Sequence, residues 1–126
     1  MFRNNLANLC VLLVLAGCAT AAPGSSVFEQ TEAFLGDEIT VSGYLKFGFE
    51  NRNLYPTQNW ERDWDKDRCI PIGIGWDDEE TSALAKSLDG QFVEVSGTVD
   101  TLLSDDDINV SFCKKIGLRV SNLKAK

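Results

Sequence analysis

Two tryptophans, a tyrosine and two arginines stand close together in one polar stretch of the chain. Trp60 and Trp64 are four positions apart, and Tyr55 precedes them. Large rings and guanidinium groups recur at the centres of binding surfaces, because rings release much water and arginine pairs with carboxylates. The alternative is that one or both tryptophans cover an open end of the folded domain. We predict a binding surface formed by Arg52, Tyr55, Trp60, Arg62 and Trp64.

Carboxylates are plentiful, but their spacing does not match a known metal or catalytic motif. Asp63 opens an alternating run that is similar to the start of a calcium loop, which requires Gly at its sixth position and Glu at its twelfth. This chain has Arg68 and Ile74 there. It contains no histidine, which excludes a Cys/His metal site and Cys–His catalysis. With no recognisable nucleophile motif either, we predict no metal, no cofactor and no enzyme activity.

The charge of the chain excludes one class of partner. The net charge is −7, from 12 basic and 19 acidic residues. Nucleic-acid affinity depends mainly on Lys and Arg neutralising phosphates, so we predict no nucleic-acid partner. The run of aspartates at 105–107 is typical of a solvated turn.

The N-terminal segment indicates where the protein resides. An apolar run over residues 9–16 follows a short segment with one charge, Arg3, and is shorter than the roughly 20 residues that span a bilayer. The run leads into Leu15-Ala16-Gly17-Cys18. This resembles the lipobox of bacterial lipoproteins, in which a peptidase cleaves before the cysteine. The resemblance implies a signal peptide over residues 1–17 and lipidation of Cys18, with palmitate among its acyl chains.

The same resemblance implies a location. Two or more acyl chains give stable membrane anchoring, and Ala19 rather than Asp after the cysteine favours the outer membrane in Gram-negative lipoproteins. We therefore expect an outer-membrane lipoprotein that faces the periplasm. The alternative is an ordinary secretory signal that is cleaved after residue 21 or 22.

Cysteine counting agrees with an exported protein. Cys10 lies in the predicted leader and Cys18 takes the lipid, which leaves Cys69 and Cys113 as an even pair. Exported proteins reside in oxidising compartments where such pairs form disulfides. We predict a Cys69–Cys113 disulfide, with two free thiols as the alternative.

Hydrophobic periodicity predicts a mainly β domain with one clear helix. The stretch 59–68 is charged and aromatic and predicts a long exposed loop. Trp76 is expected in the core or packed against the helix. Acidic residues begin the helix at residues 77–88, and Gly90 ends it. The predicted strands cover residues 39–49, 54–57, 69–74, 91–103 and 116–123.

This order of elements resembles an OB-fold, a five-stranded Greek-key barrel with its helix between the third and fourth strands. The repeated Val41-Ser42-Gly43 and Val95-Ser96-Gly97 would then lie on neighbouring strands. The two cysteines would lie at the starts of strands that pair in parallel. A small β-sandwich is the alternative fold.

The predicted organisation is a signal peptide over 1–17, a lipidated tether and lead-in over 18–36, and an OB-like domain over 37–124. For such a chain we expect a binding or adaptor module of the cell envelope whose partner is a protein, a peptide or a glycan. A structural lipoprotein of an envelope assembly is the second hypothesis, and a hydrolase using paired carboxylates is the third.

The lipobox makes a direct prediction about Cys18. Changing Cys18→Ala should abolish incorporation of labelled palmitate and block cleavage of the leader, since the thiol is the site of lipid attachment. Cys10→Ala serves as the matched control and should label normally. Labelling that persists in Cys18→Ala would contradict the assignment.

Overall fold

The computed structural model describes residues 24–106 and 110–126. The predicted leader, Cys18, the tether up to residue 23 and Asp107 lie outside the described residues. Among the described residues, no helix has the length and apolar character needed to cross a bilayer.

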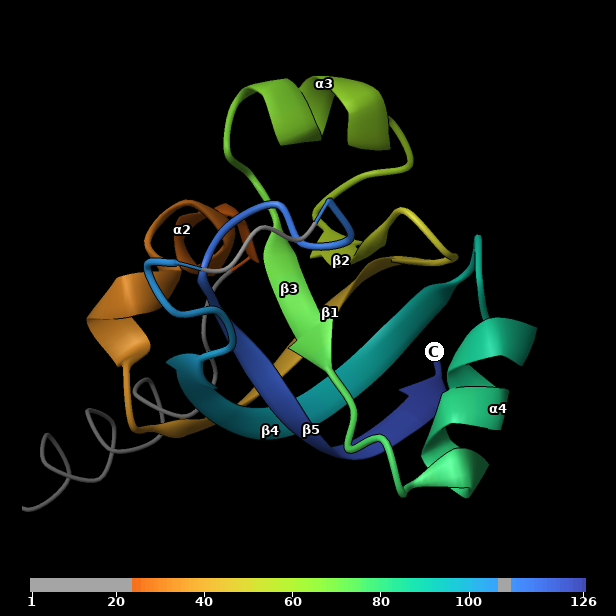
Figure 1. Ribbon diagram of the computed structural model, residues 1–126. Coiled ribbons are helices and arrows are strands. Elements are labelled where there is room, and N and C mark those ends of the chain that lie inside the picture. Colours follow the sequence, from red (N-terminus) through yellow and green to blue (C-terminus); the bar gives the residue numbers. More distant parts are fainter. Residues whose placement is uncertain (1–23, 107–109) are drawn as a thin grey trace, which may run out of the picture.

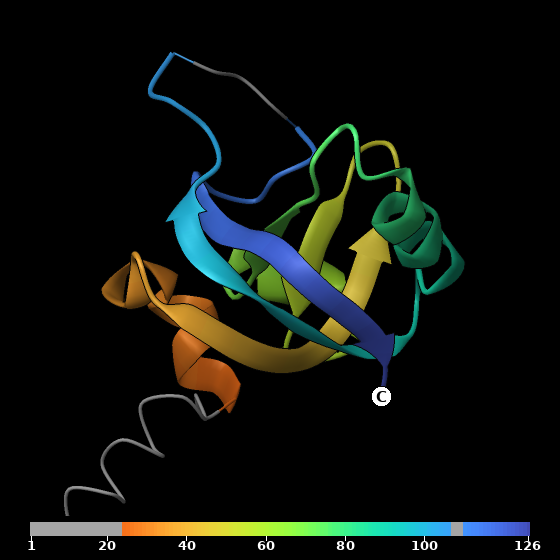
Figure 2. The same ribbon diagram turned by 90° about the horizontal axis from the view of Figure 1, so that it is seen from below.

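Five strands form a closed barrel. The order around it is β1-β2-β3-β5-β4, with β3 and β5 parallel and the other neighbours antiparallel. This confirms the predicted OB-like barrel rather than the sandwich, and Figures 1 and 2 show the strands wrapping around one core. The strands are β1 (Glu38–Phe47), β2 (Arg52–Tyr55), β3 (Ile70–Gly73), β4 (Phe92–Thr101) and β5 (Ile116–Ala125).

The core of this barrel is formed by apolar side chains that alternate with polar ones along the strands. In β1 every second side chain from Ile39 to Phe47 is buried, and β4 shows the same pattern from Val93 to Val99. The glycines of the repeated motif permit close strand contact. A Cβ added at Gly43 would lie 2.7 Å from the Tyr55 carbonyl oxygen, and one added at Gly97 would overlap the backbone of Arg119.

Helix α4 (Glu79–Ser87) lies between β3 and β4, as predicted. Asp78 caps it, accepting a hydrogen bond from the Thr81 backbone nitrogen at 3.1 Å. The helix buries only Ala85 and the C-cap Leu88 against the barrel.

The lead-in to the first strand is helical and contributes to the core. Helix α2 (Gly24–Glu29) is followed by the 3-10 helix η1 (Thr31–Phe34). Val27 and Phe28 are fully buried among the barrel residues. Figures 1 and 2 place these helices and α4 on opposite sides of the barrel.

Two local predictions were wrong. The stretch expected to be an exposed loop contains helix α3 (Trp60–Asp65), because Asn59 caps it and Asp63 is buried beneath it. Trp76 is not in the core but 95% exposed. It stands in the short segment between β3 and α4, and its exposure shows that it packs against neither the core nor the helix.

The disulfide prediction was correct. Cys69 and Cys113 are bonded, with Cα atoms 6.5 Å apart and a sequence separation of 44. Cys69 is fully buried and directly precedes β3. The bond joins the start of that short strand to the segment that leads into β5.

Reduction should therefore destabilise the barrel. A crosslink over a loop of this length contributes about 2–4 kcal/mol, which corresponds to roughly 10 °C or more in the melting temperature of a domain of this size. Calorimetry of oxidised and reduced protein measures the difference. Native material should have no free thiol at Cys69 or Cys113. An unchanged melting temperature after verified reduction would contradict this role.

Candidate binding groove

A surface groove of about 450 Å³ lies where three segments meet at one end of the barrel. The segments are the β1–β2 turn, helix α3 and the loop between β4 and β5. Its lining combines two indoles with three carboxylates. The lining residues are Glu50, Asn51, Trp60, Glu61, Trp64, Asp65 and Val110.

Helix α3 supplies the aromatic wall of the groove. Trp60 and Trp64 stand at i and i+4 and therefore share one helix face. Glu61 and Asp65 repeat that spacing one position later. Both tryptophans are partly exposed. Figure 1 shows α3 at the end of β3 opposite to α4.

A buried carboxylate holds α3 against the barrel. The Asp63 side chain is fully buried, and its Oδ2 accepts a hydrogen bond from Thr57 Oγ1 at 2.6 Å. The Arg62 guanidinium lies 3.8 Å from the Asp63 Oδ1. The Arg68 backbone nitrogen also donates to the Asp63 carbonyl, at 2.8 Å. Asp63 thus fixes both ends of a helix of only six residues.

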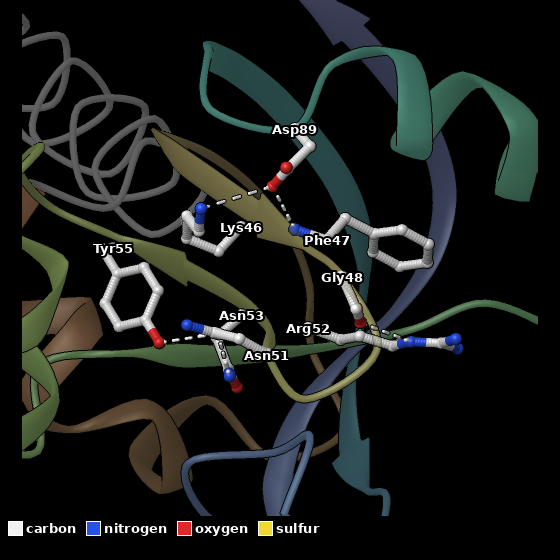
Figure 3. Close-up of polar contacts among 8 residues, drawn as sticks. All are labelled: Lys46, Phe47, Gly48, Asn51, Arg52, Asn53, Tyr55 and Asp89. Carbon is white, nitrogen blue, oxygen red and sulfur yellow. Dashed lines mark hydrogen bonds and ion pairs between the residues drawn. The ribbon is translucent and has the colours of Figure 1, made fainter.

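A second buried polar residue, Asn53, ties the other two segments together. Its Nδ2 donates to Asn51 Oδ1 at 2.7 Å and to the Ser111 carbonyl at 2.8 Å. Its Oδ1 accepts from the Cys113 backbone nitrogen at 2.9 Å. Tyr55 Oη donates to the same Asn51 oxygen at 2.8 Å. Figure 3 shows Asn51, Asn53 and Tyr55 converging in this cluster.

The loop between β4 and β5 is therefore anchored next to the groove. The disulfide attaches Cys113 to the start of β3, and Asn53 binds the same residue through its backbone. The Lys114 ammonium donates to the Phe28 carbonyl at 2.9 Å, and burial lowers the pKa of this lysine. Consecutive residues of the loop are thus held by β3, β2 and α2.

The structure brings together two of the five predicted binding residues. Trp60 and Trp64 both line the groove. Tyr55 lies beneath it, because its side chain is fully buried and its ring centroid is 6.1 Å from that of Trp60. Tyr55 supports the groove rather than facing solvent.

The two predicted arginines lie apart from the groove lining. Arg52 stacks over the Phe47 ring at 4.9 Å and its Nε donates to the Gly48 carbonyl at 3.3 Å. Figure 3 shows it pointing away from Tyr55. Arg62 extends toward Asp63 on the other side of α3. Neither side chain faces the tryptophan pair.

Sequence reasoning missed the acidic part of the lining. Glu61 and Asp65 follow the two tryptophans by one position each, so a helical assignment for 60–65 would have placed all four side chains along one surface. Glu50 and Val110 come from distant turns, and no local pattern indicates them. Among residues 24–106 and 110–126, no group of three or more Cys, Asp or Glu side chains is arranged to hold a metal ion.

The fold is that of an OB-like barrel with a groove at one end. A scan against models of known protein families found no match, and a search of curated proteins found no similar sequence.

The buried tyrosine should make stability depend on alkaline pH. Burial raises the pKa of Tyr55 to about 12, although hydrogen bonding with Asn51 and Asn53 opposes the shift. The unfolded-state pKa is near 10, so this stabilisation is complete below about pH 10 and is lost as the pH rises towards 12. From about pH 9 to 11, wild type should lose about 1 kcal/mol more folding free energy than Tyr55→Phe.

Denaturant titrations at both pH values measure this difference. Tyr44→Phe is the matched control and should lose as much stability as wild type over the same interval. An equal loss in Tyr55→Phe would show that ionisation of Tyr55 does not limit alkaline stability.

Proposed function

We propose that this protein is a lipid-anchored binding or adaptor module of the bacterial cell envelope, which holds a protein, peptide or glycan in the groove. The observation that carries the proposal is the pair of partly exposed indoles in a surface groove, on a helix anchored by Asp63. Tryptophan is among the residues that contribute most to binding free energy when a partner covers it.

The rigidity of the groove supports the same function. Its walls are fixed by Asn53, Asp63 and the Cys69–Cys113 disulfide. A preformed surface loses less conformational entropy on binding, so more of the contact energy appears as affinity. Such a groove suits recognition of a partner without a chemical step.

The lipobox supports a location at the outer membrane, facing the periplasm. Val27, which is buried in the core, follows Cys18 by nine positions. A chain of that length spans at most about 32 Å. The tether would therefore keep the barrel near the membrane surface, where its partner would be an envelope component.

A structural role in an envelope assembly is the second candidate. A separate hollow of about 730 Å³ includes Trp76, which is almost fully exposed, and apolar side chains from the segment after β3, from β5 and from the loop between β4 and β5. Exposed apolar patches mark protein contacts in many proteins. This surface would serve assembly without the groove.

Substitution of the tryptophans separates the two candidates. Truncating an aromatic hot spot costs about 2 kcal/mol or more, so Trp60→Ala or Trp64→Ala should lower partner recovery by about tenfold or more. Recovery is measured by crosslinking in intact cells and pull-down, and the melting temperature is measured for each variant. Trp76→Ala is the matched control and should leave recovery unchanged.

Other results would favour other roles. Loss of recovery in Trp76→Ala alone would favour the assembly role. If recovery falls in the groove variants only as far as their stability falls, the tryptophans are structural and the partner binds elsewhere.

A further inference from the structure

The lining of the groove is negatively charged as well as aromatic. Its charged lining residues are Glu50, Glu61 and Asp65, and no lysine or arginine of the described part of the chain lines it. We propose that the groove binds a cationic peptide segment, in which lysine or arginine side chains meet these carboxylates and the faces of Trp60 and Trp64. This inference rests on the proposed function and names the class of its partner.

The carboxylates of the groove are free to pair with a partner. Among the described residues, the ion pairs use other acidic side chains, and none of them neutralises a carboxylate of the groove. The paired acids are Glu29, Asp63, Asp89, Glu94, Asp100 and Asp105. A cation that enters the groove would therefore gain attraction without breaking an internal ion pair.

The protein already contains one example of the contact that we propose. The Lys46 ammonium lies 5.7 Å from the Trp60 ring centroid and 3.8 Å from the Asp89 carboxylate. A cation thus sits between an indole and a carboxylate at the edge of the site. Cation–π attraction is strongest for tryptophan and amounts to about 0.5–1 kcal/mol at exposed sites.

A peptide fits this lining better than the other cationic or polar ligands. Hard divalent cations take oxygen ligands, and the indoles would add nothing to such a site. Neutral sugars would stack on the indoles and donate hydroxyl hydrogen bonds to the carboxylates, but they would leave the negative charge of three carboxylates uncompensated. A lysine or arginine side chain satisfies both features, because its charge pairs with the carboxylates and its cation packs on the indole faces. The volume of about 450 Å³ matches small-ligand sites, so it would hold about two or three peptide residues.

The test uses a defined probe and the full-length protein. Fluorescence anisotropy follows a labelled hexapeptide of alternating glycine and lysine, at about 0.15 M salt, where long-range attraction is screened. The same peptide with acetylated lysines has no side-chain charge and should bind about tenfold more weakly or worse.

Matched charge variants separate the groove from general attraction to an acidic protein. The double variant Glu61→Gln with Asp65→Asn should lower the affinity for the lysine peptide by about fivefold or more. Glu79→Gln with Glu80→Gln removes the same charge from exposed positions on α4 and should change affinity by less than about twofold. Thermal melts of both double variants confirm folding.

Three results would overturn the inference. They are no binding of the lysine peptide, equal binding of its acetylated form, and equal weakening by the two double variants. None of them contradicts the proposed function, which depends on whether Trp64→Ala lowers partner recovery. Conversely, unchanged recovery in Trp64→Ala would reject the proposed function even if the peptide binds.

Discussion

Closure of the barrel depends on β3, a strand of four residues that must pair on both sides. Ile70 and Pro71 pair with β2, whereas Ile72 and Gly73 pair with β5. Pro71 has no amide hydrogen to donate, and its carbonyl lies where a Cβ on Gly117 of β5 would be. Close approach of the two backbones at this glycine lets the sheet close between β3 and β5. This junction, or seam, has only two paired residues in each strand, and the disulfide at the start of β3 reinforces it.

The same seam positions the groove. Cys113 is bonded to Cys69 by the disulfide and to Asn53 through its backbone nitrogen, so one residue joins barrel closure to the loop that borders the groove. Asn53 lies on the outward phase of β2 yet is fully buried, because that loop covers it. The long loop between β4 and β5 is therefore held by covalent and polar contacts where it borders the site.

The sequence predicted the parts of this architecture that depend on local periodicity. Alternation identified the strands and the order of elements indicated an OB-like barrel, which in turn brought Cys69 and Cys113 together. Helix α3 was missed because it is held by a buried Asp63, which accepts a hydrogen bond from Thr57 just before the helix, rather than by an apolar stripe. Tyr55 was predicted to be a surface residue, although α3 and the loop between β4 and β5 cover the outer face of β2 and bury it. The residue pattern of a strand does not show whether other segments cover its outer face.

Two buried polar atoms that lack a hydrogen bond lie in the segments that form the groove. Among the described residues, two side chains contain buried nitrogen or oxygen atoms without a hydrogen-bond partner, Asn51 and Asp63. One belongs to the turn that lines the groove and the other to the helix that forms its wall. Such atoms cost about 1–3 kcal/mol each, and proteins concentrate these departures from good packing at functional sites. The turn and the helix that form the groove therefore each contain an incompletely hydrogen-bonded polar group.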